Sequence, residues 1–316
     1  MTTHFKLAAA GLLLTGLIAA AGCNQPNATT EPAAAEAPAA SPDVYRFKVG
    51  TIETIALRDG GMSGVPNDNT ILGVGRTPAE VSAVLTANSL PGDTFDLSIQ
   101  PLLVRDGQRL VLIDAGAGTN MGEGAGKLPA SLRAAGVEPS TITDVLISHG
   151  HGDHVGGLVD AAGALTYPNA TVRMSAPEWT ALQAQAPLAA LVAAIAPKVE
   201  TFEPGAQVTP AVLAVPIRGH TPGHTGYEVR SGDDRLLYIA DSAHHHVVSV
   251  QKPDWANSFD GNPQAMQSRI ALLGRAADEN LRLYAVHFPF PGIGRVTRRE
   301  DGTLVWAPEG SGATGS

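Results

Sequence analysis

Residues 149–154 read His-Gly-His-Gly-Asp-His, and these six positions contain four potential metal ligands. They follow Asp144–Ile147, a short segment typical of a buried strand, after the single residue Ser148. A strand end that opens into a glycine-rich loop can turn neighbouring imidazoles and a carboxylate toward one point, because Gly150 and Gly152 carry no bulky side chain. Imidazole and carboxylate groups together suit zinc, manganese or iron(II). The stretch therefore predicts a metal site at the end of a strand.

Three further candidate ligands lie far along the chain. His220 lies in a segment that reads Gly-His-Thr-Pro-Gly-His-Thr, and Asp241 and His287 each follow a short apolar, strand-like run. The single cysteine, Cys23, lies far from them, so the ligand set contains only nitrogen and oxygen donors. Two metal ions about 3.5–4 Å apart can share one hydroxide and polarise one substrate oxygen. The combined set is large enough to hold two such ions.

These residues give the chain a resemblance to the metallo-β-lactamase superfamily over about residues 45–307. Within it, the chain is similar to methyl parathion hydrolase-like and quorum-quenching lactonase sequences. The supporting segments are Gly126–Leu132, Tyr167–Ala170, Gly219–Thr225 and Phe288–Gly294. The resemblance implies an α/β protein with a single-domain αββα sandwich and a two-metal site at one edge.

The resemblance also implies a role for each candidate ligand. One metal ion would be held by His149, His151 and His220, the other by Asp153, His154 and His287, with Asp241 as the bridge between them. In the family a hydroxide bridges the two ions, so we expect Asp153 and Asp241 to be catalytic residues. Asp114 would orient a ligand imidazole from behind. We expect two divalent ions, zinc first, with Mn²⁺, Fe²⁺ and Co²⁺ as alternatives.

Several neighbouring residues are harder to interpret. His224 is expected to make structural hydrogen bonds rather than bind metal. His244–His246 could line the substrate pocket, hydrogen-bond metal ligands or be solvated loop residues, and the sequence leaves these alternatives open. Arg295 stands where related sequences have His, which puts the local pocket wall in doubt. Candidate pocket walls, each of a type that is more often a core residue, are Trp179, Trp255, Phe259, Phe288 and Phe290.

Composition excludes some classes of protein. The chain has 316 residues, of which 44% are apolar and 16% charged, enough for a sizeable core. Its formal net charge of −9 argues against a nucleic-acid or anionic-membrane surface binder. The apolar and polar periodicities predict strands at 45–49, 52–57, 98–104, 109–113, 144–147, 171–174, 212–215, 226–230, 235–240, 283–286, 296–298 and 304–306. Helices are predicted at 78–87, 128–135, 177–185, 188–194 and 263–277.

The N-terminus predicts export. Leu7–Gly22 is a 16-residue apolar run, shorter than the roughly 20 residues of a membrane span and typical of a signal peptide. It ends at Cys23 in a sequence that resembles a bacterial lipobox, although Ala20 stands where Leu is preferred. We therefore expect lipidation at Cys23, and Asn24 favours a periplasm-facing outer-membrane anchor. A plain secretory signal is the alternative. The expected segments are a signal peptide at 1–22, an Ala/Pro-rich tether at 23–42, a catalytic domain at 43–309 and a disordered tail at 310–316.

Four functions compete at this stage. The first is hydrolysis of an ester-like bond in a small apolar lactone, aryl ester or phosphotriester, by a hydroxide shared between two metals. The second is a true β-lactamase, although the common dizinc enzymes use a cysteine at the second metal. A nuclease of the same fold is disfavoured by the acidic charge. The last is a metal- or ligand-binding lipoprotein without turnover. A homodimer is possible, and no nucleic-acid partner is expected.

Overall fold

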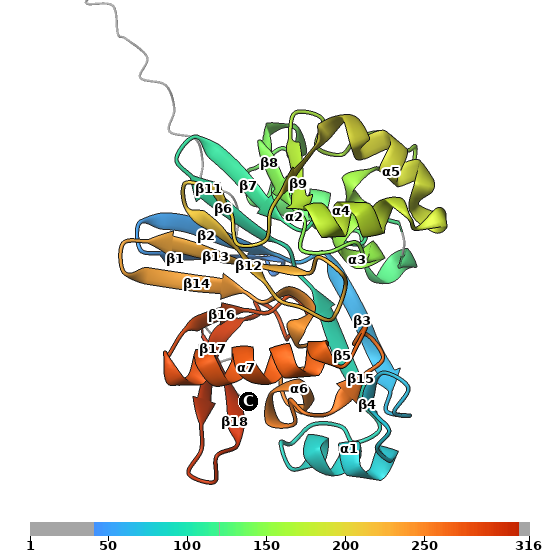
Figure 1. Cartoon of the computed structure of the whole chain (residues 1–316), viewed down its shortest axis with the longest axis vertical. Coiled ribbons are helices and arrows are strands. Elements are labelled where there is room, and N and C mark those ends of the chain that lie inside the picture. The colour runs from blue at the N-terminus through green and yellow to red at the C-terminus, as the bar shows by residue number, and fades with distance from the viewer. Residues whose placement is uncertain (1–40, 120, 310–316) are drawn as a thin grey trace, which may run out of the picture. The chain divides into compact units, whose positions relative to one another are not determined.

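The computed structural model describes residues 41–119 and 121–309. The signal peptide, Cys23, nearly all of the tether and the predicted tail lie outside the described residues. Two seven-stranded sheets dominate the fold (Figure 1). The first runs in the order β1 (Val44–Val49), β2 (Ile52–Leu57), β6 (Leu102–Asp106), β7 (Arg109–Ile113), β8 (Asp144–Leu146), β9 (Thr171–Ser175) and β10 (Val199–Phe202). The second runs in the order β11 (Gln207–Thr209), β12 (Val212–Pro216), β13 (Thr225–Ser231), β14 (Asp234–Tyr238), β16 (Arg282–Tyr284), β17 (Ile293–Arg298) and β18 (Leu304–Pro308).

Strand periodicity explains why the sheets stack. Successive side chains of a strand point to opposite faces, and apolar residues occupy both faces of the central strands. Leu236 thus packs between the two sheets, whereas Leu237 packs against the helix side of the second sheet. In the first sheet Ile113 faces the second sheet, whereas Leu112 faces the helices. Each sheet is therefore buried on both faces, as in a sandwich.

Helices cover the two outer faces. On the first sheet lie α2 (Leu128–Ala134), α4 (Ala176–Gln183) and α5 (Ala189–Ile195). On the second lies α7 (Gln264–Asp278), which buries Leu273 and Ala276 against it. Figure 1 shows α4 and α5 on the opposite side of the strands from α7. The layers follow the order helix, sheet, sheet, helix, so the predicted αββα sandwich is confirmed.

A smaller group of elements extends from one edge of the sandwich. A two-stranded ribbon pairs β3 (Gly60–Pro66) with β5 (Thr94–Ile99), and β4 (Leu72–Val74) pairs with β15 (Ala256–Asn257). The remaining helices are α1 (Pro78–Thr86), α3 (Gly152–Val155) and α6 (Val248–Gln251). At the start of α1, Thr77 and Glu80 form a reciprocal capping box, which satisfies two free N–H groups of the first turn. Leu85 and Val81 of α1 join Phe95 and Leu97 in a separate apolar cluster.

The sequence prediction of one strand over 98–104 is wrong. The chain instead leaves β5 at Ile99 and enters the first sheet at Leu102. Pro101 has no N–H to donate to a ladder, and the fully buried Gln100 donates instead to the carbonyls of Ala285 and Phe288, both at 2.9 Å. The break lets β5 pair with β3, a glycine-rich strand that the sequence pattern did not predict.

No single helix among the described residues is long and apolar enough to span a membrane. Helix α4 and residues Ala186–Lys198 meet the length and composition criterion only as a pair, and the two are bent by 90°. Their apolar side chains Leu182, Leu191 and Ile195 are buried in the core of the first sheet.

Candidate metal centre

The loop that follows β8 and the short helix α3 that it enters together carry four of the seven predicted ligands. The backbone of the loop is fixed from two directions. Asp114 accepts hydrogen bonds from the Ser148 N–H and hydroxyl, both at 2.7 Å, and Glu178 accepts the Gly150 N–H at 2.7 Å. A Cβ on Gly150 would lie 3.0–3.3 Å from the side chains of Leu182 and Glu178, so a larger residue would be crowded. The glycine therefore lets the loop sit against α4.

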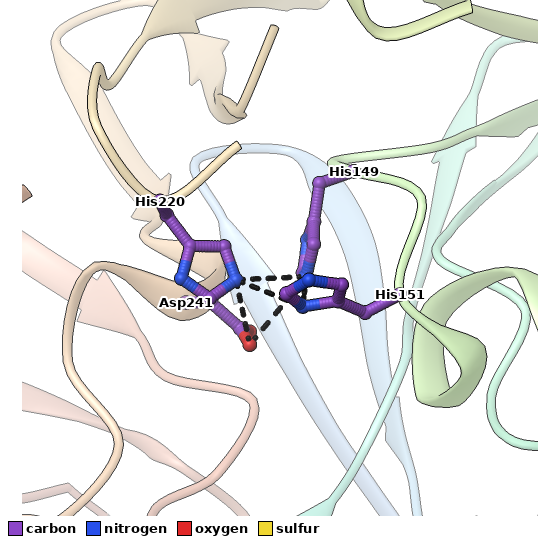
Figure 2. Close-up of side chains that lie close together, drawn as sticks. All are labelled: His149, His151, His220 and Asp241. Carbon is purple, nitrogen blue, oxygen red and sulfur yellow. Dashed lines mark hydrogen bonds and ion pairs between the residues drawn. The ribbon is translucent and has the colours of Figure 1, made fainter. Parts of the chain in front are cut away.

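Three imidazoles converge to form a first ligand group. His149 Nε2 lies 3.0 Å from His151 Nδ1, and His220 Nε2 lies 3.1 Å from both of these atoms. Asp241 Oδ2 completes the group at 3.5 Å from His149 Nε2 and 3.4 Å from His220 Nε2. Figure 2 shows the four side chains pointing toward one another. A common focus of three nitrogens and one oxygen is the donor set of a divalent transition metal.

A second ligand group lies on the other side of Asp241. Asp241 Oδ1 is 3.1 Å from both His154 Nε2 and His287 Nε2. Asp153 Oδ2 lies 3.6 Å from His154 Nε2 and 3.7 Å from His287 Nε2. Asp241 thus offers one carboxylate oxygen to each group, which is the arrangement that a bridging ligand needs. The structure brings all seven predicted ligands together.

Hydrogen bonds behind the rings assign the tautomers of three ligand histidines. His154 Nδ1 donates to Asp114 Oδ2 at 2.8 Å, and His287 Nδ1 donates to the Ser98 carbonyl at 2.8 Å. The single proton of the Ser148 hydroxyl goes to Asp114, so this oxygen accepts from His149 Nδ1 at 3.0 Å. Each of these rings therefore keeps its Nδ1–H behind it and turns Nε2 toward the ligand groups, where a bound metal ion would take the lone pair of Nε2. The predicted contact of Asp114 with a ligand imidazole is present.

These observations test whether the residues fit two metal ions. His154 Nε2 is buried without a hydrogen-bond partner, which is costly unless another group, such as a metal ion, binds this atom. The imidazole nitrogens of the first group approach one another within 3.1 Å, and an ion at their focus would accept all three lone pairs. The donor sets of both groups suit zinc and related divalent ions. The residues therefore fit a dinuclear site.

Burial and charge set the protonation of the centre. Burial holds the pKa of His149 and of His220 well below the usual value, so both rings are neutral and able to bind metal. Burial would raise the pKa of Asp241, but the surrounding histidines outweigh it and hold this pKa well below its usual range. Burial would likewise lower the pKa of His154, yet nearby carboxylates, Asp241 first, raise it well above the usual value.

Asp241 sits on a tight turn, Ala240–Ser242, that follows β14. Ala240 has φ of 43°, a left-handed conformation that is strained for a residue with a Cβ. The Asp241 N–H donates to His224 Nε2 at 3.1 Å, and His224 Nδ1 donates to the Ile217 carbonyl at 3.0 Å. Burial lowers the pKa of His224 to about 4, so the ring is neutral, as these two bonds require. The predicted structural role of His224 is confirmed.

A cavity of about 480 Å³ opens above the two ligand groups. Its polar floor contains His151, Gly152, Asp153, Asp241, His244 and His287. Its walls are apolar and come from Met62, Ile71, Leu97, Met121 and Phe259. A small-molecule site of this kind combines apolar walls with a few converging polar groups.

The sequence pattern predicted only part of this cavity. Of the five aromatic candidates, Phe259 lines it, whereas Phe288 is fully buried in the core. Met62, Ile71, Leu97 and Met121 were missed. They carried no pattern of their own, since β3 was not predicted and the other three residues belong to a strand and loops that meet only in three dimensions.

The histidine run after Asp241 divides into different environments. His244 is buried and lines the cavity, so the pocket interpretation is correct for this residue. His245 is also buried, and its Nδ1 accepts the N–H groups of Val247 and Val248 at the start of α6. The solvated-loop interpretation is therefore wrong for both. Arg295 lies on β17 with its side chain bonded to the Asn280 carbonyl, and the residues lining the cavity do not include it.

Comparisons with known proteins agree with this geometry. A profile of the metallo-beta-lactamase superfamily matches residues 96–295. The chain belongs to this superfamily of metal-dependent hydrolases.

Solved structures give closer comparisons within the superfamily. The dizinc quorum-quenching lactonase AidC, solved with the product N-hexanoyl-L-homoserine, is 30% identical, with a TM-score of 0.77, over 84% of this chain and 97% of AidC. The hydrolase AbOPH is 28% identical, with a TM-score of 0.74, over 86% of this chain and 99% of AbOPH. A probable metal-dependent hydrolase from Staphylococcus aureus, 21% identical over 84% of this chain and 100% of its own, has the same fold with a TM-score of 0.69. No protein of curated function matches the chain.

Proposed function

We propose that the chain is a dinuclear metal-dependent hydrolase that opens the ring of N-acyl-homoserine lactones. The observation that carries the proposal is the placement of Asp241, which offers one oxygen to each of two ligand groups at the floor of an apolar cavity. AidC, a dizinc lactonase, supports this substrate class through its similarity over most of the chain.

The ligand residues would form two groups, each of which would hold one metal ion. His149, His151 and His220 would hold one, and Asp153, His154 and His287 the other, with Asp241 shared. Two divalent ions, when bound, activate water for attack and polarise the substrate carbonyl. Zinc is the ion we propose, in keeping with the donor set and with AidC.

Asp153 is suited to moving a proton. Its carboxylate lines the cavity and is 22% exposed, whereas Asp241 and Asp114 are buried. We infer that the Asp153 carboxylate takes the proton of the attacking water and returns it to the oxygen of the opened ring. General acid–base transfer of this kind contributes typically 10²–10⁴-fold to a rate. No serine nucleophile or covalent intermediate is needed.

The cavity walls favour an apolar acyl chain. Met62, Leu97 and Phe259 present flexible or flat apolar surfaces beside the ligand groups. A flexible methionine adapts to irregular ligand shapes at little cost. Each methylene that the acyl chain buries against these walls contributes about 0.8 kcal/mol, so affinity should rise with chain length until the cavity is filled.

A substrate panel on protein loaded with two equivalents of zinc tests the proposal. It compares N-acyl-homoserine lactones of increasing chain length with a 4-nitrophenyl ester, a 4-nitrophenyl phosphotriester and nitrocefin. We expect kcat/KM to be highest for a lactone and to increase with acyl length. Asp241→Ala should abolish turnover, whereas His246→Leu, outside the cavity, should retain it. Absence of lactone turnover, or a higher kcat/KM for the phosphotriester or nitrocefin, would contradict the proposal.

A further inference from the structure

His244 occupies a position beside the two ligand groups that neither the family comparison nor the ligand assignment uses. It lies three residues after Asp241, and its side chain is 2% exposed. Its Nε2 atom is 3.2 Å from Asp241 Oδ2, closer than His149 Nε2 or His220 Nε2. A carboxylate only accepts hydrogen bonds, so Nε2 of His244 carries the proton and donates it.

This donor differs from the imidazoles around it. His149, His154 and His287 donate Nδ1–H to acceptors behind the ring, so Nε2 of each is the atom that would bind a metal ion. The Nε2 atoms of His154 and His287 lie 3.1 Å from the other oxygen of Asp241, Oδ1. His244 makes no such bond, since its Nδ1 is buried without a hydrogen-bond partner. Its N–H is therefore free to bind the oxygen of Asp241 that faces the first ligand group.

The ring of His244 is also held in one orientation. Two of its ring neighbours stack on it, Phe259 at 4.6 Å and 26° and His287 at 5.3 Å and 11° between ring planes. Its backbone N–H donates to the Ser249 hydroxyl at 3.3 Å. Stacking and backbone bonding together fix the direction of the Nε2–H bond.

We propose that His244 is a positioning residue, which holds the Asp241 carboxylate so that each oxygen faces one of the two ligand groups. The proposal rests on the dinuclear site proposed above. The Asp241 carboxylate can rotate about its Cβ–Cγ bond, and a directed N–H on one oxygen selects the orientation that serves both groups. Removing a partner of this kind from a metal ligand typically weakens metal affinity 10–100-fold.

A competing role for His244 makes a different prediction. Asp241, His244 and His287 also bring their ligand atoms within 4.8 Å of one another, so His244 could itself bind a metal ion. An Nε2 atom that donates its proton to Asp241 cannot coordinate at the same time. The two roles therefore separate in the spectrum of a cobalt(II)-substituted protein, which reports the number of nitrogen ligands.

Metal titration of three variants of the full chain tests the proposal. His244→Leu removes the N–H donor, and His244→Gln restores a donor. His246→Leu is the control, because the ring of His246 contacts His245 and Phe288 rather than a ligand carboxylate. Competition with a chelator should show 10–100-fold weaker binding of cobalt(II) or zinc in His244→Leu. We expect partial recovery in His244→Gln and unchanged binding in His246→Leu. Thermal melts of the metal-free proteins check that each variant is folded.

Two outcomes would overturn the inference. One is wild-type metal affinity in a folded His244→Leu protein. The other is a cobalt(II) spectrum of His244→Leu that shows one nitrogen ligand fewer, which would make His244 a ligand. Both are read from metal binding alone. Failure of the lactonase proposal would instead appear as two tightly bound ions in the wild-type chain without lactone turnover.

Discussion

Asp114→Asn is a substitution whose effect can be worked out atom by atom. Asp114 Oδ1 accepts the Ser148 N–H, and Oδ2 accepts three further donors, the hydroxyls of Ser148 and Tyr238 at 2.7 Å and His154 Nδ1 at 2.8 Å. An asparagine that keeps the bond to the Ser148 N–H must place its NH₂ group where Oδ2 stood. The two hydroxyls can rotate to accept from this group, but the N–H of His154 cannot.

The conflict leaves His154 two costly choices. It can keep its tautomer and leave a buried N–H facing another donor, or it can move the proton to Nε2 and lose the lone pair that faces Asp153 and Asp241. Losing one hydrogen bond to a charged group costs about 1.5–3 kcal/mol. Metal affinity should therefore fall roughly 10- to 100-fold, in line with other changes behind metal ligands.

Chelator competition with zinc on the metal-free protein measures this change. Asp278→Asn is the matched control, because it removes the same charge at a surface residue that pairs with Arg298. It should bind zinc like the wild type. Wild-type zinc affinity in Asp114→Asn would refute the argument that Asp114 sets the tautomer of His154.

Three further changes give independent checks. Asp144 is buried between Arg109 and Arg173, and although burial raises its pKa, the hydrogen bonds from Thr143 and the two guanidiniums outweigh this and hold it below the usual 3.8. The ionised Asp144 carboxylate contributes fully to the free energy of unfolding above about pH 4. This contribution is lost as the pH falls through the pKa of Asp144 in the folded protein. Asp144→Asn should therefore lower the free energy of unfolding in urea by about 1–3 kcal/mol at pH 7 and by less at pH 3, whereas an equal loss at both pH values would contradict this. Asp241→Ala should reduce zinc stoichiometry below two per chain, measured by elemental analysis after dialysis, and full stoichiometry would rule out a bridging role. In detergent phase partitioning, Cys23→Ser should shift the expressed protein from the detergent phase to the aqueous phase. Unchanged partitioning would contradict the expected lipid anchor at Cys23.

The features that the sequence predicted well are those encoded locally. Four ligand candidates lie within residues 149–154, and their spacing alone indicates a metal site. The αββα order of layers is confirmed, because apolar strands alternate with amphipathic helices along the chain. The structure brings the predicted ligands together, and their binding of metal remains a prediction that the titrations above address.

The features that the sequence did not predict depend on distant partners. Strand β3 contains three glycines and forms because β5 pairs with it, so its own residues give no strand pattern. The apolar walls of the cavity were missed for the same reason, since Met62 faces its partner Leu97 only after this pairing. The role of His244 could not be chosen either, because its hydrogen bond to Asp241 depends on the turn at Ala240.

The ribbon of β3 and β5 contacts both the loop that carries His287 and the substrate cavity. At its base, the Ser98 N–H donates to the His287 carbonyl at 3.1 Å, and the Ser98 carbonyl accepts from His287 Nδ1 at 2.8 Å. Gln100, two residues on, bonds to the carbonyls on either side of the same histidine loop. One residue further along the ribbon from Ser98, Leu97 and its partner Met62 line the cavity. For an engineer who wants a new substrate range, Met62 is therefore a position to randomise, whereas mutation of Gln100, whose side chain holds the His287 loop, would alter selectivity and metal loading together.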